Sequence, residues 1–237
     1  DGDGTDSDNI TDGDDELGTQ PQPYYGVDAL TALERMPEFL PLASGAQFTS
    51  SDPAGGSYDY LGNNLYLEGT NQVIFDSKRP GCIYRIQLNN DLSSTVQSVN
   101  LSFYFENETS PRISDIVGYI FEGSHAPFLT PLVGKTVLVG QTAQSYYSYV
   151  PICWQERLKI VADKALSGYN IQYHNFASGV GIESYNSSLD LNDAVEYYSE
   201  NLGEDPKPDH GDATHVIQDS YPVSAGSQRT LTVISQA

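Results

Sequence analysis

Acidic, glycine and tyrosine residues are concentrated in residues 48–62, FTSSDPAGGSYDYLG. Asp52 followed by proline favours a turn, and Gly55-Gly56 supplies a positive φ or a close backbone approach. Carboxylate acceptors beside flat apolar tyrosine rings form the mixture of surfaces that binds sugars. The segment is therefore a candidate glycan-binding loop, with a plain connection between strands as the alternative. Its candidate contacts are Asp52, Gly55, Gly56, Tyr58 and Asp59.

Carboxyl groups are the residues that glycoside hydrolysis would need. The reaction normally uses two of them, about 5 Å apart for retention of configuration or roughly 6.5 to 9.5 Å apart for inversion. One of the two has to be kept protonated by its surroundings. The carboxyl groups available for such work are Asp52, Asp59, Glu68, Asp76 and Glu122.

Other chemistries have weaker support in the sequence. The histidines are scattered at His125, His174, His210 and His215, and a metal site in the polar stretch HGDATH is a minor alternative. No phosphate-binding glycine loop, nucleophile elbow or dinucleotide fingerprint is present. Trp154 is expected in core or sheet-edge packing. Most of the 17 tyrosines are expected in the sandwich, with a minority at a glycan groove or subunit contact.

The first sixteen residues, DGDGTDSDNITDGDDE, hold oxygen-bearing side chains at spacings of two and three. This spacing suits calcium, and it partly reproduces the ligand ladder of an EF-hand loop. Asp6 stands in place of the expected glycine, however, and no amphipathic helices flank the segment. It resembles the aspartate-rich calcium repeats of thrombospondin-type linkers, and a solvated acidic tail is the alternative. The candidate calcium ligands are Asp1, Asp3, Asp6, Asp8 and Asp12.

The cysteines and the glycosylation sequons favour an extracellular, secreted protein. A disulfide between Cys82 and Cys153 is the preferred interpretation, with two buried thiols as the alternative. Sequons occur at Asn9, Asn100, Asn107 and Asn186. Two of these lie on the polar side or at the end of an expected strand, where a glycan would project into water.

The charge of the chain limits its partners. The 32 acidic and 11 basic residues give a net charge of −21, and removing the eight acids of residues 1–16 still leaves −13. Such a surface argues against binding to nucleic acid or to anionic membranes, while neutral glycans and cations remain open. No apolar run of about eighteen residues is present, so no membrane span is expected.

Alternation of apolar and polar residues predicts an all-β fold, an antiparallel β-sandwich or jelly roll. Two clear examples of alternating apolar residues are Leu101, Phe103 and Phe105, and, later in the chain, Tyr169, Ile171 and Tyr173. A short N-terminal helix is expected after a cap at Asp28, and a second helix over residues 191–202. The predicted divisions are an acidic segment (1–17), a linker (18–25), the sandwich (26–185) and a helix with a connector to a possible second sandwich (186–237).

Four stretches, in this order, resemble glycoside hydrolase family 172: GVDALTALERMPE, RPGCIYRIQL, SYYSYVPICWQERLKIVA and YNIQYHNFASGVGIESYN. The family's loop has the form S-x-D-x-x-G-G-N-x-D, and Ser50, Asp52, Gly55, Gly56 and Asp59 fit it. Ser57 stands where the family usually carries asparagine, which removes one expected sugar contact.

The resemblance implies that catalysis lies outside this sandwich. The family's catalytic glutamates come from a second jelly roll, and no residue of this sequence matches them. No catalytic residue is therefore assigned, and enzymatic activity stays open. The family also assembles as trimers or multiples of them. Two hypotheses follow: a glycan-contacting module of a carbohydrate-active protein, or a non-catalytic structural or adhesive subunit of an extracellular assembly.

Overall fold

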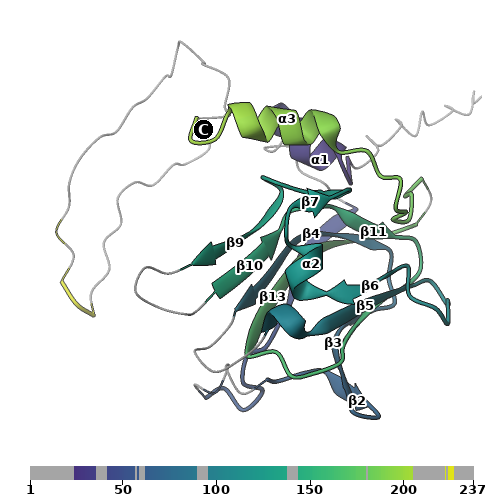
Figure 1. The fold of residues 1–237 in the computed structure, drawn as a ribbon, viewed down its shortest axis with the longest axis vertical. Coiled ribbons are helices and arrows are strands. Elements are labelled where there is room, and N and C mark those ends of the chain that lie inside the picture. The colour runs from purple at the N-terminus through teal and green to yellow at the C-terminus, as the bar shows by residue number, and fades with distance from the viewer. Residues whose placement is uncertain are drawn as a thin grey trace, which may run out of the picture. The chain divides into compact units, whose positions relative to one another are not determined.

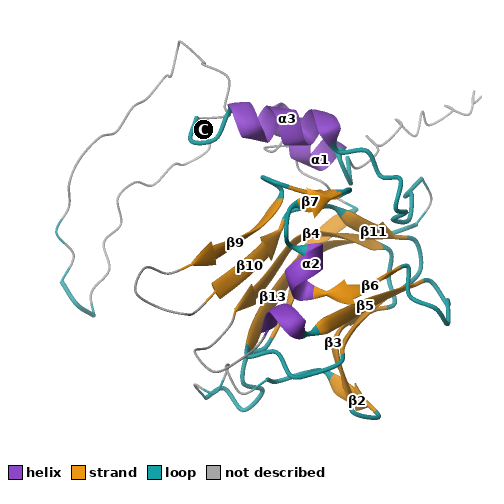
Figure 2. Cartoon of the chain, viewed as in Figure 1, coloured by secondary structure: helices purple, strands orange, loops and turns teal. Residues whose placement is uncertain are grey.

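A computed structural model describes residues 24–35, 42–56, 58, 62–89, 96–137, 144–179, 181–204, 222 and 224–226. The chain divides into two compact units, Asp1–Pro206 and Lys207–Ala237. Within the described residues, strands in antiparallel sheets dominate, which confirms the predicted fold class (Figure 2). No helix in these ranges is long and apolar enough to cross a membrane.

Two sheets form the sandwich (Figure 1). The first, sheet A, has the order β1 (Ala43–Thr49), β13 (Gly168–Phe176), β4 (Gly81–Asn89), β10 (Gln144–Ser148) and β9 (Val133–Val137), with β11 (Ile152–Trp154) also paired to β4. The second, sheet B, has the order β2 (Tyr66–Glu68), β3 (Asn71–Ser77), β12 (Leu158–Ala162), β5 (Asn100–Phe105) and β6 (Ile113–Ile116). A small hairpin pairs β7 (Ser124–His125) with β8 (Phe128–Leu129).

The strand order is that of a jelly roll. The first main strand, β1, pairs with the last, β13, and β3 pairs with β12. Moving inward along the chain, β4 pairs with β10 and β5 with β6. Pairing of outer with outer and inner with inner is the pattern of one long hairpin rolled over two sheets.

The core lies between the sheets and is built by the predicted alternation. On β5, Leu101, Phe103 and Phe105 are buried, while the residues between them are half-buried. Phe75 from sheet B contacts the Phe48 and Trp154 rings from sheet A, with ring centroids 4.9 and 5.5 Å apart. Trp154 is fully buried, as its predicted packing role requires. Aromatic rings from both sheets thus fill the core between them.

The helices are short and lie outside the sheets. They are α1 (Asp28–Thr31), α2 (Val117–Ile120) and α3 (Asn192–Glu200), with 3₁₀ turns at Leu33–Arg35 and Val96–Ser98. Figure 1 shows α1 beside α3, and the Tyr198 hydroxyl donates to the Leu30 carbonyl at 2.7 Å. The N-terminal helix and the C-terminal helix therefore pack together although they are far apart in the sequence.

Two details of the helix predictions were wrong. The N-cap of α1 is Val27 without a side-chain cap bond, and Asp28 lies inside the first turn. There its negative charge faces the positive end of the helix dipole. An aspartate is therefore favourable in the first turn as well as at the N-cap. The second helix was predicted over residues 191–202, but α3 ends at Glu200, and Leu202 lies beyond it and is 70% exposed.

Candidate functional site

The candidate loop leaves sheet A at the end of β1, and Ser50, the first residue after this strand, anchors it. Ser50 is buried and forms two hydrogen bonds with the backbone of Tyr169 on β13. The Ser50 N–H donates to the Tyr169 carbonyl, and the Ser50 hydroxyl accepts from the Tyr169 N–H, both at 3.1 Å. The register fixes this contact, because Thr49 lies opposite Asn170. The loop therefore leaves the sandwich from a rigid point.

Asp52 shapes the turn that follows. Its Oδ1 accepts the Ala54 N–H at 2.9 Å, and its carbonyl accepts the Gly55 N–H at 2.9 Å. Gly55 has a φ of +74°, and a Cβ at Gly56 would come within 2.5 Å of Asp52 Oδ2. The positive φ thus favours glycine at position 55, while a side chain at position 56 would displace the Asp52 carboxylate. At least one Asp52 oxygen is a structural acceptor.

Asn63 closes the loop from its far side, a role that the sequence analysis missed. Its Nδ2 donates to the carbonyls of Ser50 at 2.9 Å and Tyr58 at 3.0 Å, so one amide holds both ends. The Tyr58 side chain, in contrast, is 56% exposed. An asparagine directly after Gly62, whose φ is +74°, is the sequence signal that would have indicated this clamp.

The loop therefore places an exposed aromatic ring beside an internally bonded acidic turn. Ser57, residues 60–61 and the predicted contact Asp59 lie outside the described residues. Among the predicted contacts, the structure brings Asp52, Gly55 and Gly56 together in one turn, with the Tyr58 backbone tied to the same clamp.

The candidate carboxyl group of Asp76 holds neighbouring segments together on the outer face of sheet B. Asp76 accepts two bonds from Arg157, both at 2.9 Å, and one from the Tyr66 hydroxyl at 2.6 Å. Burial raises the pKa of Asp76, but these hydrogen bonds and the Arg157 charge outweigh it, and the pKa lies below its ordinary value. A proton donor needs the opposite shift.

Glu68 and Glu122 also have local partners. Lys159 Nζ lies 2.8 Å from a Glu68 oxygen, and His125 Nε2 lies 3.1 Å from Glu122. These carboxylates sit on strand β2 and beside the β7–β8 hairpin, respectively. The geometry thus gives them contacts that stabilise strands and turns.

A comparison with family models identifies the sandwich. The model described as the GH172 first beta-sandwich domain matches residues 43–193. The chain belongs to glycoside hydrolase family 172. The matched range runs from the first residue of β1 into α3, so it contains both sheets and the candidate loop. A search of curated proteins found no match.

Cys82 and Cys153 in this family 172 domain form a disulfide with an S–S distance of 2.07 Å. They face each other on the paired strands β4 and β11. Of the predicted glycosylation sites, Asn107 and Asn186 are exposed. Asn100 is half-buried, and its Oδ1 accepts from the Ser102 hydroxyl at 3.2 Å.

The predicted metal sites fall largely outside the described residues. These positions are Asp1, Asp3, Asp6, Asp8 and Asp12, and the alternative pair His210 and His215. The predicted glycosylation sequon at Asn9 also lies outside the described residues. In the part of the family 172 chain that the structure describes, no three His, Cys, Asp or Glu residues form a group that could hold a metal ion.

Proposed function

We propose that the chain is an extracellular jelly-roll module of a carbohydrate-active protein, contributing glycan contacts and subunit assembly without catalytic carboxylates of its own. Family membership carries the carbohydrate part of this proposal. The glycan contacts are assigned to the 48–62 loop, where an anchored turn presents the exposed Tyr58 ring. Tyrosine rings and fixed polar groups together bind the apolar and hydroxyl faces of sugars.

The extracellular assignment is supported by two observations. A disulfide between strands persists in oxidising compartments and is rare in the cytosol. The exposed sequon asparagines Asn107 and Asn186 are accessible to a glycosyltransferase. Assembly into trimers or higher oligomers follows from the family resemblance and is part of the proposal.

A non-catalytic structural or adhesive role is the second candidate. It is favoured by the use of the carboxyl groups, because Asp76 and Glu68 are tied to basic side chains and Asp52 supports its own turn. Under this alternative the jelly roll has kept the family's architecture but uses its surfaces for extracellular contacts.

Substitutions in the loop separate the two candidates. Glycan binding by the full chain is measured by calorimetry against oligosaccharides of arabinan, fructan, mannan and β-glucan. Tyr58→Ala and Asp52→Asn should each weaken binding by about tenfold, the equivalent of one lost ring or charged hydrogen-bond contact. Tyr119→Ala, which removes another exposed tyrosine, is the matched control. Binding that both loop variants retain would assign the loop a structural role.

A further inference from the structure

The outer face of sheet A carries amide side chains on three neighbouring strands. On β13, Tyr169, Ile171 and Tyr173 are buried, so the residues between them point away from the core. Residues directly opposite one another in an antiparallel pair share a face. The pairs Gln172 with Gln47, Gln172 with Arg85, and Asn170 with Gln87 therefore lie on this outer face. We name Gln47, Gln87, Asn89, Asn170 and Gln172 the amide face.

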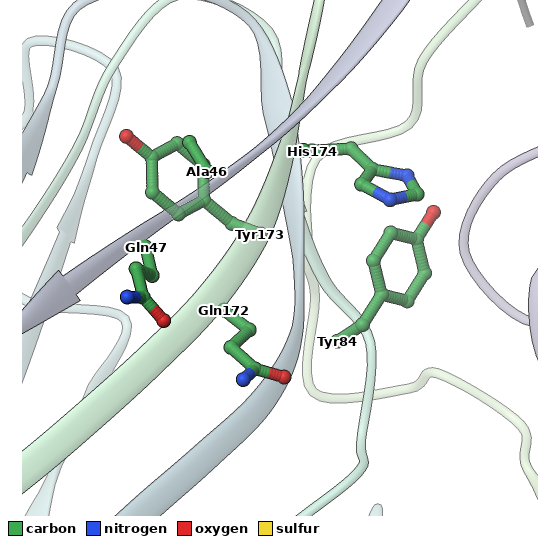
Figure 3. Close-up of a pocket in the computed structure, with 7 residues that line it drawn as sticks. Ala46, Gln47, Tyr84, Gln172, Tyr173 and His174 are labelled. Atoms are coloured by element: carbon green, nitrogen blue, oxygen red, sulfur yellow. The ribbon is translucent and has the colours of Figure 1, made fainter. Parts of the chain in front are cut away.

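One end of the amide face is hollowed. A pocket of about 450 Å³ is lined by residues of β1, β4 and β13. Figure 3 shows the Gln47, Gln172, Tyr84 and His174 side chains around it. Gly45, opposite His174, has no side chain that could fill the space. The Tyr84 and His174 rings meet edge to face at 5.0 Å and form one wall.

The amides are linked to one another, which holds the face in a fixed arrangement. Asn170 Nδ2 donates to Gln47 Oε1 at 3.2 Å, and Arg85 donates to Gln87 Oε1 at 2.6 Å. Ser145 of β10 donates to Asn89 Oδ1 at 2.8 Å. Such preorganised polar groups lose little conformational freedom when a ligand binds.

Two polar atoms on this face lack a partner. Among the described residues, Arg85 Nε and Asn170 Oδ1 are enclosed without a hydrogen bond. Buried polar groups without a partner are rare in proteins and call for an explanation. Both side chains are half-buried and lie at the exposed surface of the sheet. One atom is a donor and the other an acceptor, and a hydroxyl group can satisfy either.

The charge of the face limits the ligand further. The amide face and its paired neighbours on β1, β4, β10 and β13 carry Arg85 but no carboxylate, within the described ranges. Burial also lowers the pKa of His174, which favours the neutral ring. A divalent cation would find no anionic ligands here, and a polyanion would meet a chain of net charge −21.

We infer that the amide face, with the hollow at Gly45, binds a neutral oligosaccharide. Hydroxyl groups of the sugar pair with the Gln47, Asn170 and Gln172 amides, and the Tyr84–His174 wall packs against an apolar sugar face. Gly45 to Thr49 spans roughly 13 Å along the strand, enough for a short oligosaccharide. The face is polar where the centres of protein interfaces are rich in large apolar and aromatic side chains, which favours a sugar over a second protein.

The test uses the full chain and the double variant Gln47→Ala/Gln172→Ala. Calorimetry against neutral arabinan, fructan, mannan and β-glucan oligosaccharides should show binding by the unaltered chain and binding about tenfold or more weaker in the variant. Ser102→Ala/Ser114→Ala, which removes exposed polar groups from sheet B, is the control and should bind normally. Affinity should not change between 50 and 500 mM NaCl, because the ligand carries no charge.

Tyr58→Ala, measured in parallel, separates this inference from the loop proposal. Weaker binding in the amide-face variant alone supports the amide face and rejects the loop. Weaker binding in Tyr58→Ala alone rejects the amide face. Absence of binding to any neutral glycan, or salt-sensitive binding to polygalacturonate only, also overturns the inference. The inference is also overturned if the double variant binds glycan normally but shows a changed mass in sedimentation. That result would assign the face to contact between copies of the chain.

Discussion

The Glu106 carboxylate joins segments of the sandwich that are far apart in the sequence. It follows β5 and accepts the N–H groups of Gln155 at 3.0 Å, Glu156 at 2.7 Å and Arg157 at 3.1 Å. The Ser184 hydroxyl donates to it as well. Glu106 adopts a φ of +53°, uncommon for a residue with a side chain, so these bonds hold it in an unfavourable backbone conformation.

Glu106→Gln should lower the free energy of unfolding at pH 7 by about 1.5–3 kcal/mol, the range for hydrogen bonds to a charged group. Burial raises the pKa of Glu106, but the hydrogen bonds from Ser184 and the backbone lower it by a larger amount. The pKa therefore lies below its ordinary value. A lowered pKa contributes stability above the ordinary carboxyl value of about 4.3, and this is lost as the pH falls through the folded value.

The difference between Glu106→Gln and the unaltered chain should therefore shrink at pH 3, which lies below the ordinary carboxyl pKa of about 4.3. Urea unfolding at pH 7 and pH 3 measures it. Glu183→Gln, which alters an exposed carboxyl nearby in the fold, is the control and should have little effect at either pH. A loss of equal size at both pH values would show that the charge of Glu106 is unimportant.

At the scale of strands, the disulfide fixes β11 against β4. Cys82 and Cys153 are 71 positions apart, and Trp154 beside them packs so closely that a Cβ at Gly81 would lie 2.5 Å from its ring. Replacing both cysteines by alanine should lower the free energy of unfolding by about 4 kcal/mol in the chain-entropy model. Guanidinium unfolding with and without reductant measures this, and reductant should affect the unaltered chain only. A loss below about 1 kcal/mol would mean that packing alone holds β11.

Alternation predicted the strands whose two faces differ. β5 and β13 follow it, since one side meets the core and the other meets water. Alternation does not predict β11, because Ile152, Cys153 and Trp154 are all buried. β1 also gave no clear signal, since this strand at the edge of its sheet is largely exposed or half-buried. The rule depends on a contrast between faces, and these strands lack one.

The candidate site was predictable only in part, for a related reason. Local sequence identifies the turn around Asp52, because Asx turns and glycine dihedrals depend on adjacent residues. The anchors at Tyr169 and Asn170 depend on strand register and on partners that are distant in the sequence, 119 positions apart for Ser50 and Tyr169, which only the folded chain defines. The amide face was missed because its members are separate polar positions on three strands.

At the scale of the molecule, the two outer faces differ in chemistry while the chain as a whole is strongly acidic. Sheet B carries charged pairs such as Asp76 with Arg157, and sheet A carries amides. With 32 acidic and 11 basic residues, most acids cannot have a basic partner of their own. Their mutual repulsion opposes a compact state, and cations reduce it. Bound cations such as calcium would therefore stabilise a chain of this charge.

We propose that residues 1–16 supply a calcium site through Asp1, Asp3, Asp6, Asp8 and Asp12. Calorimetric titration of the chelator-treated full chain with CaCl₂ should then show a dissociation constant on the order of 10⁻⁴–10⁻³ M, as in extracellular calcium modules. Changing the five aspartates to asparagine should abolish this heat, because neutral amides are much weaker ligands for the cation. NaCl at matched ionic strength separates specific coordination from screening. Equal heats from the unaltered and five-asparagine chains would show that calcium only screens the acidic surface.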